Sequence, residues 1–335
     1  MKRNSLLLKK NSEKEVNKMT DLSSIDMRDA FFDTLYDIAS QNPDVYFLSD
    51  DHGAFGLEKF QKDFPDRYIN IGIAEQNMIG ISSGLSLSGK IVYCYGISPF
   101  VSLKVLEQIS LDLAAMGANV NIVSVGAGFT YSTDGPSHHG LQDLSAVLTT
   151  PNITIFNSSD PVSTKAFAKM GIDQMGPKYI RIEKGTLPSL ERHEDKDFSR
   201  GVSEIKKGSD LTIIASGAIV HEALNSAKIL KEELDLNVGV IDLYRIKPLP
   251  DDALIELLKD TKKIVTLEEG YLDGGMGSMV ASLLLEKSVF RPFLRLGIKN
   301  HFCFDYGTRE YLLDLHFLSA KEVARKIKTI IFKEY

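Results

Sequence analysis

The 335-residue sequence lacks several features that mark large classes of protein. It contains only two cysteines, Cys94 and Cys303, which excludes a disulfide framework and fits the reducing cytoplasm. No apolar run is long enough to cross a bilayer, and the three leucines near the N-terminus are too few for a signal-peptide core. A formal net charge of −6 argues against a general nucleic-acid binder. We therefore expect a cytoplasmic protein whose partners include neither membranes nor nucleic acids.

The chain has enough apolar material, 43% of its residues, for about two domains. Residues 1–24 are polar, charged and aperiodic, which predicts a mobile tail. Short apolar strands alternate with amphipathic helices over residues 25–190, and the alternation resumes over 208–335. Residues 191–207, which include the run E-R-H-E-D-K-D, are predicted to be a linker. We therefore expect an α/β fold with two domains, each built on a parallel sheet between helices, the second domain being the smaller.

The predicted elements place three polar segments where parallel sheets form their sites. In the first domain we expect strands over 45–48, 68–71, 90–95, 121–125, 153–156 and 179–181, and helices over 27–40, 74–87, 101–116 and 161–170. In the second we expect strands over 211–216, 238–243 and 263–267, and helices over 219–234, 250–258, 278–285 and 321–331. Asp51, Glu75 and the loop 126–140 all follow strands, so they converge at the carboxyl edge of the first sheet.

The segment D-G-P-S-H-H-G at residues 134–140 holds two adjacent histidines. A metal site is a poor interpretation, because adjacent side chains point in different directions and zinc sites need separated ligands. An acid/base role and a polar loop both remain open on the residues alone. The glycines at 274–277 lack the G-x-G-x-x-G spacing, so they predict a close strand-helix turn instead of a dinucleotide loop. We expect no metal ligand in this chain.

Four segments in order carry a family resemblance. They are N-I-G-I-A-E-Q-N-M-I-G at 70–80, S-P-F at 98–100, D-G-P-S-H-H-G at 134–140 and T-L-E-E-G-Y-L-D-G-G-M-G at 266–277. Together they resemble the C-terminal half of a transketolase, which comprises a pyrimidine-binding domain and a transketolase C-terminal domain. The resemblance implies thiamine diphosphate as cofactor and transfer of a two-carbon ketol unit between sugars or sugar derivatives.

The resemblance assigns cofactor-binding roles to residues of the first domain. Glu75 matches the glutamate that hydrogen-bonds the far ring nitrogen of the aminopyrimidine and so supports the imino tautomer that deprotonates the thiazolium. A carboxyl in a pocket of low dielectric has a raised pKa and suits this task. Phe100 matches the aromatic residue that stacks on the pyrimidine ring. Ile73 and Ile97 are candidates to line the same pocket, and Asp51 matches an acidic position near the cofactor.

The resemblance also implies residues that meet the sugar. Asp134 and His138 match the pair that approaches the sugar hydroxyls, and a histidine of near-neutral pKa can accept and return a hydroxyl proton. His139 is a structural or supporting candidate. The sequence departs from the family pattern at Gly126, where sugar-phosphate transketolases tend to carry a histidine, and at Lys184, where they tend to carry an arginine. Lysine lacks the planar fork of arginine, so a modified or nucleotide-linked sugar is a possible substrate.

One family element is missing, and it implies a partner. The G-D-G motif that holds the diphosphate and its Mg²⁺ (or Ca²⁺) belongs to the family's N-terminal domain, and nothing here matches it. The chain therefore resembles one half of a split enzyme, assembled with an N-terminal subunit as a heterotetramer and self-associating through the pyrimidine-binding domain. The small residues of helix 78–87 (Gly80, Ser82, Ser83 and Gly84) suit close packing at that interface.

Two alternative functions remain open on the sequence. One is half of an enzyme similar to 1-deoxyxylulose-phosphate synthase, which decarboxylates a 2-oxo acid. The other is a non-catalytic regulatory paralogue, against which the joint presence of Glu75, Phe100 and His138 argues.

Overall fold

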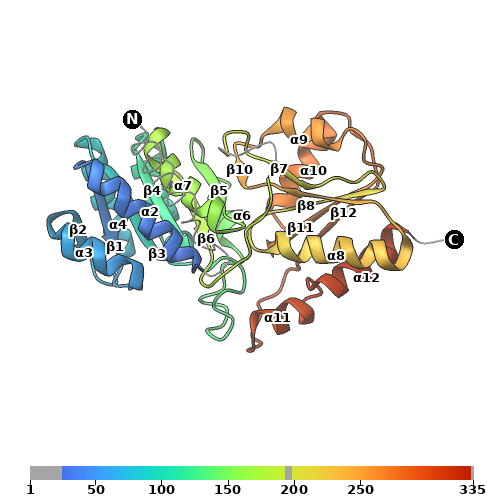
Figure 1. The fold of residues 1–335 in the computed structure, drawn as a ribbon. Helices are drawn as coiled ribbons and strands as arrows, with labels where there is room; N and C mark the ends of the chain where they lie inside the picture. Colours follow the sequence, from blue (N-terminus) through green and yellow to red (C-terminus); the bar gives the residue numbers. More distant parts are fainter. Residues whose placement is uncertain (1–24, 193–197, 333–335) are drawn as a thin grey trace, which may run out of the picture.

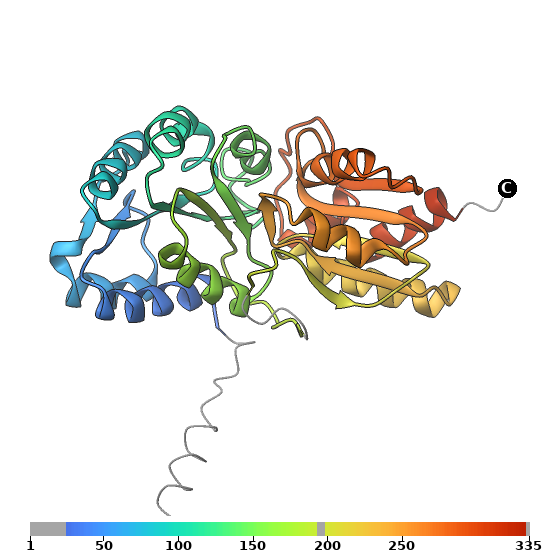
Figure 2. The ribbon, with the colours of Figure 1, turned by 90° about the horizontal axis from the view of Figure 1, so that it is seen from above.

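The structure, a computed structural model, describes residues 25–192 and 198–332 (Figure 1). Residues 1–24, predicted as a mobile tail, lie outside the described residues. Two sheets of mostly parallel strands lie side by side, each with helices on both faces (Figure 2). The predicted two-domain α/β fold is therefore confirmed. In the described part of the chain, no helix has the length and apolar character needed to span a bilayer.

The first sheet has seven strands in the order β10-β5-β6-β4-β3-β1-β2. Its strands are β1 (Val45–Ser49), β2 (Tyr68–Asn70), β3 (Ile91–Ile97), β4 (Val120–Val125), β5 (Thr154–Asn157), β6 (Lys178–Ile182) and β10 (Arg245–Lys247). All neighbours pair in parallel except β10 and β5. Every residue of β4 and β6 is buried, because helices cover both faces of a parallel sheet.

The helices of the first domain are α2 (Met27–Gln41), η2 (Phe55–Leu57), α3 (Glu58–Asp63), η3 (Pro65–Arg67), α4 (Glu75–Leu87), η4 (Leu103–Val105), α5 (Leu106–Gln108), η5 (Ile109–Ala115), α6 (Asp143–Val147) and α7 (Pro161–Asp173). Helices α2 and α7 begin at side-chain caps. The carboxylate of Asp26 accepts the backbone N–H of Arg28 at the start of α2. Asp160 and Ser163 form a reciprocal capping box at the start of α7, with proline as its first residue.

The prediction of one continuous helix over 101–116 is wrong. The segment is a 3₁₀ turn (η4), a single α turn (α5) and a π-helix (η5). A π turn shifts the hydrogen-bond register, and side chains compete for the displaced carbonyls. Here the hydroxyl of Ser83 donates to the carbonyl of Asp112 at 2.7 Å.

That contact also corrects the predicted packing face of α4. Ser82 and Ser83 are buried against their own domain, so they do not belong to an outer face. Gly80 and Gly84 do face outward, with open space where a side chain would stand. Large apolar side chains are exposed around them: Ile73 before α4, Leu87 at its end, and Leu111 and Met116 on or beside η5.

The second sheet has five strands in the order β12-β11-β8-β9-β7. Its strands are β7 (Ser203–Lys206), β8 (Leu211–Ala215), β9 (Val238–Asp242), β11 (Ile264–Tyr271) and β12 (Phe293–Ile298), and the helices are α8 (Ile219–Leu234), α9 (Asp251–Leu258), α10 (Met276–Glu286), α11 (Arg309–Leu315) and α12 (Ala320–Ile331). Helix α8 has the predicted bounds because its apolar residues recur at helical spacing and face the sheet.

The structure corrects the predicted linker. Its last residues form β7, which pairs antiparallel with β9, so the range 191–207 contains part of the second sheet. Strand β10 lies in the sequence of the second domain but pairs with β5 at the edge of the first sheet. Arg192 joins the two units further, because its guanidinium is 2.7 Å from both Asp160 and Asp242.

Candidate active site

The predicted site residues gather at the carboxyl edge of the first sheet. Asp51 follows β1, Glu75 begins α4 beyond β2, and Ile97 ends β3. The loop 126–140 follows β4, and Lys184 follows β6. These five strands are parallel, so their carboxyl ends meet at one edge, as the alternation of elements predicted.

Two buried carboxyls stand close together at this edge. Glu75 is only 2% exposed, and its Oε2 accepts a hydrogen bond from Nζ of Lys104 at 2.5 Å. The side chain of Lys104 is half-exposed, so the partner of Glu75 is itself in contact with solvent. Asp50 is buried beside Glu75. Burial raises the pKa of Asp50 to about 6, against the hydrogen bond from the backbone N–H of His52 and with a further contribution from the charge of Glu75.

Asp51, predicted near the cofactor, instead faces solvent. Its backbone φ of 72° turns the chain away from the sheet, and its carboxylate accepts a hydrogen bond from the amide of Asn70 at 2.9 Å. Asp50, which sequence reasoning missed, is the buried member of the pair. Its position could have indicated this, because Asp50 is the first charged residue after the buried strand β1.

The apolar candidates occupy different environments. Ile73 is 80% exposed and lies on the surface before α4. Ile97 is buried at the end of β3, and the backbone N–H groups of Phe100 and Val101 both donate to its carbonyl. Phe100 is half-buried and meets His138 edge-to-face with ring centroids 5.2 Å apart. The structure thus brings Phe100 and His138 into contact, and Phe100 packs against the buried cluster that contains Ile97.

Tyr131 and His52 are site residues that the sequence did not reveal. Gly126 has a φ of +97°, and a Cβ there would lie 2.5 Å from the ring of Tyr131, so the ring occupies the space of any side chain at 126. The hydroxyl of Tyr131 lies 3.2 Å from Nε2 of His52, within hydrogen-bond distance. The ring of Tyr131 also lies 6.3 Å from that of His138. A tyrosine–histidine pair therefore borders the site next to His138.

Charges of both signs lie near this pair. Burial and then the charges of Arg28, Lys184 and His138 lower the pKa of His52, which keeps its imidazole neutral. Nζ of Lys184 lies 5.4 Å from the ring centroid of Tyr131. Asp134 is exposed on the same loop as His138. A pocket of about 490 Å³ opens beside the cluster and is lined by Arg28, Gly53, Ala54, Phe55, Glu58, Gln61 and Lys184.

The two adjacent histidines face different rings. His139 is buried and meets Phe129 edge-to-face at 5.2 Å, whereas His138 faces Phe100. Burial lowers the pKa of His139, so it packs as a neutral imidazole. The pair does not converge on one point, which agrees with the argument against a shared metal ion.

The glutamates of the 266–277 motif have structural partners. Glu268 accepts the backbone N–H groups of Met276 and Gly277 at 2.7 and 2.9 Å, so it caps α10 at the predicted strand-helix turn. Glu269 accepts the backbone N–H of Phe129 at 2.7 Å and pairs with Arg309. This motif therefore joins the second domain to the site loop.

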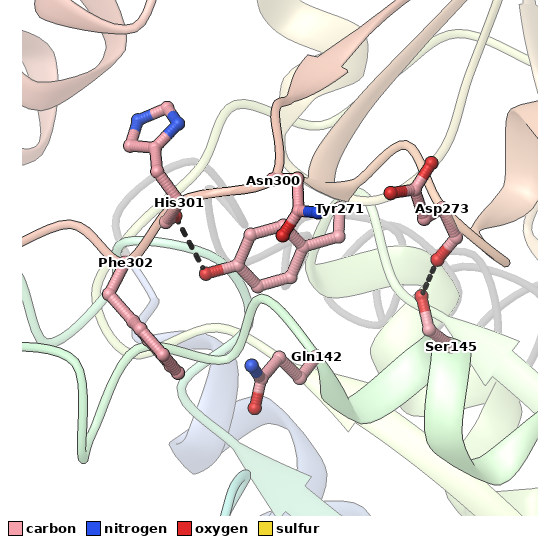
Figure 3. A pocket seen from close by; sticks show the side chains of 7 residues that line it. All are labelled: Gln142, Ser145, Tyr271, Asp273, Asn300, His301 and Phe302. Atoms are coloured by element: carbon pink, nitrogen blue, oxygen red, sulfur yellow. Dashed lines mark hydrogen bonds between the residues drawn. The ribbon is translucent and has the colours of Figure 1, made fainter.

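A smaller pocket lies where the two domains meet (Figure 3). Tyr271 donates to the carbonyl of His301, and Ser145 donates to the carbonyl of Asp273, both at 3.0 Å. Its volume of about 230 Å³ is below the range of ordinary ligand pockets. We regard it as a packing gap at the domain junction.

Both halves of the chain match known protein families. Residues 23–189 match the model of the transketolase pyrimidine-binding domain, and residues 201–323 match that of the transketolase C-terminal domain. An apulose-4-phosphate transketolase subunit of Phocaeicola vulgatus is 34% identical, over 82% of this chain and 87% of that protein. A 6-deoxy-6-sulfo-D-fructose transketolase subunit of Clostridium sp. strain MSTE9 is 30% identical, over 89% of this chain and 92% of that protein.

A solved structure and a longer enzyme complete the comparison. A split-gene transketolase described as an inactive beta4 tetramer superposes with a TM-score of 0.82 and 31% identity, over 92% of this chain and 99% of that one. The 1-deoxy-D-xylulose-5-phosphate synthase of Crocosphaera subtropica is 30% identical over 90% of this chain but only 48% of its own length.

Proposed function

Because this chain belongs to the transketolase family and comprises its pyrimidine-binding and C-terminal domains, we propose that it is the C-terminal half of a split transketolase. Such an enzyme is a transferase that moves a two-carbon ketol unit between sugars or sugar derivatives. The main support for the proposal is the length of this chain relative to the proteins it resembles. Separate transketolase subunits align over nearly their whole sequence, whereas the single-chain synthase extends to about twice this length.

The residues at the sheet edge fit the aminopyrimidine end of thiamine diphosphate. When bound, this cofactor supplies the carbon nucleophile that carries the two-carbon unit. A buried carboxyl, Glu75, and a half-buried ring, Phe100, lie at the same edge. We assign Glu75 to the hydrogen bond with the far ring nitrogen, Phe100 to stacking, and Ile97 to the wall behind it. Lys104, the present partner of Glu75, is half-exposed and can return to solvent when the ring arrives.

The other side of the site suits a sugar. We assign His138 to proton exchange with the sugar hydroxyl, since it lies against Phe100 and next to Tyr131. We assign Asp134, which is exposed on the same loop, to the sugar hydroxyls as well. Lys184 lines a pocket with Arg28 and Glu58, and since Arg28 is paired with Asp26, we assign Lys184 to an anionic group at the far end of the substrate.

The diphosphate needs residues from another chain. Among the described residues, no group of three metal-ligating side chains lies at this edge, although a Mg²⁺-bridged diphosphate needs several oxygen ligands. We therefore propose that an N-terminal transketolase subunit holds the diphosphate and Mg²⁺ or Ca²⁺. The outward-facing Gly80 and Gly84, with exposed Ile73 and Leu111 beside them, form the surface proposed for assembly into a cytoplasmic heterotetramer.

Calorimetry of the purified chain tests this proposal. Alone, with Mg²⁺, it is expected to bind thiamine diphosphate weakly or not at all and to transfer no ketol unit. Addition of the partner subunit is expected to restore binding and activity together. Tight binding and transfer by the isolated chain contradict the split-enzyme proposal. Assays with a ketose donor and with pyruvate separate ketol transfer from the decarboxylating alternative, and a reconstituted complex inactive on both supports a regulatory chain.

A further inference from the structure

A cluster of three different ligand types lies in the second domain, apart from the candidate active site. Cys303 and Asp305 belong to the loop after β12, and His316 is the residue that ends α11. One ligand atom from each lies within 4.8 Å of the other two. Nε2 of His316 is 3.0 Å from Sγ of Cys303, and the thiol side chain is only 1% exposed.

The donor set has a clear chemical preference. A thiolate, an imidazole and a carboxylate are the three protein ligands that zinc accepts, at bond lengths of about 2.0–2.3 Å. Those lengths place tetrahedral ligand atoms roughly 3–4 Å apart, so the observed separations need only small side-chain rotations. Magnesium and calcium prefer oxygen ligands throughout, which makes a sulfur-containing set unsuitable for them.

The sulfur and the imidazole are already in contact, Nε2 of His316 lying 3.0 Å from Sγ of Cys303. Binding of a divalent cation would release the thiol proton, and the sulfur would become a ligand.

We propose that Cys303, Asp305 and His316 form a binding site for a zinc-like divalent cation. Three protein ligands leave one tetrahedral position for water. The imidazole of His301 stacks on that of His316, with centroids 5.3 Å apart, and holds it in place. Figure 3 shows the ring of His301 turned away from the domain-junction pocket.

The location gives the cation a structural role. The other face of His316 stacks on Phe129 at 5.2 Å, and Phe129 lies against His139. On the same loop as Cys303, Tyr306 reaches the site loop, because a Cβ on Gly135 would lie 3.1 Å from its hydroxyl. A bound cation would fix the loop between β12 and α11, and with it the surface on which residues 126–140 rest.

Cobalt absorption of the untagged full chain tests the site. After treatment with a chelator, Co²⁺ is added, because a cobalt–thiolate bond gives a charge-transfer band in the near ultraviolet. The expected result is one equivalent of Co²⁺ with this band, displaced by Zn²⁺. Cys303→Ser is expected to abolish the band, and Asp305→Asn to weaken binding at least about 10-fold. Cys94→Ser is the matched control, since Cys94 is equally buried but has no such neighbours, and it should keep the band.

A second measurement covers folding of the variants. Zn²⁺ should raise the thermal unfolding midpoint of the wild type and of Cys94→Ser, and leave that of Cys303→Ser and His316→Gln unchanged. Absence of the cobalt band in the wild type, or its survival in Cys303→Ser, overturns the proposal and leaves a thiol–imidazole hydrogen bond. None of these readouts depends on catalytic activity or on a partner subunit.

Discussion

The carboxyl edges of the two sheets both carry buried glutamates, but they satisfy them differently. In the second sheet, Glu268 accepts two backbone N–H groups, and Glu269 accepts one as well as the guanidinium of Arg309. In the first sheet, Glu75 accepts a hydrogen bond from Lys104, whose side chain is half-exposed. Burial is therefore common to both edges. The two edges differ in the partners of their carboxylates. Backbone N–H groups and Arg309 are permanent partners that stabilise the fold, whereas half-exposed Lys104 is an exchangeable partner that can leave the carboxyl of Glu75 free for a ligand.

The largest effect on turnover is expected at Glu75, the carboxyl with the exchangeable partner. Glu75→Ala should abolish turnover of the complex reconstituted with its partner, because the ring nitrogen loses its carboxyl, while the circular dichroism spectrum stays native. The matched change Glu268→Ala should lower thermal stability but leave turnover of the folded protein measurable, because it removes a helix cap. Wild-type activity in Glu75→Ala would show that the cofactor assignment is wrong.

A comparison within the site loop comes next. His138→Ala should lower kcat by ~10²–10⁴-fold, the usual cost of losing a positioned acid/base, with little change in cofactor affinity. The control is His139→Asn, whose effect should be far smaller because His139 packs on Phe129. Steady-state kinetics and cofactor titration measure the two quantities. A large loss of cofactor affinity with unchanged saturated rate would move His138 from the sugar to the cofactor.

Loss of a permanent partner should lower the stability of the folded chain. Glu269→Gln removes the carboxylate that pairs with the guanidinium of Arg309 and should reduce the free energy of unfolding in urea by about 1–3 kcal/mol. Glu233→Gln is the control, because its pair with Lys328 is exposed and should contribute less than about 1 kcal/mol. Equal effects of the two substitutions would contradict the structural role given to Glu269.

A pH dependence of stability is expected at Asp50. Its pKa is raised from 3.8 to about 6 in the folded chain, so folding favours its protonated form. Its contribution to stability is fully present below the unfolded value and is lost as pH rises through about 6. Asp50→Asn removes this group and should flatten the fall in the unfolding midpoint between about pH 4 and 6. An unchanged pH profile would mean that Asp50 is solvated.

Sequence patterns predicted what depends on local periodicity. Helix α8 and the central strands were found because many apolar residues repeat along one face. Strands β7, β10 and β12 were missed. The first two have only three or four residues, which carry no periodic signal, and both form only through distant partners. The helix over 101–116 was wrong because nothing local reveals a hydroxyl that arrives from α4.

The same limit applies to the candidate site. Glu75, Phe100 and His138 were proposed from motifs, and the contact of Phe100 with His138 follows from the fold. Tyr131 and His52 are brought together across 79 positions of sequence, so their pairing had no local signal. Asp50 and Asp51 are adjacent acids, and only the backbone turn at the second decides which of them is buried.

The pairing of β10 with β5 has a genetic corollary. Recombination between related genes, with a crossover anywhere between residues 190 and 203, would replace the edge strand of the first sheet together with the whole second domain. The incoming Arg245–Lys247 segment would have to match Phe156 and Ile155 in register, and a lysine at 247 would have to reach the carbonyls of Leu148 and Thr150. The two halves are therefore expected to be inherited together, and chimaeras joined at this boundary should survive only when the newcomer carries a compatible strand.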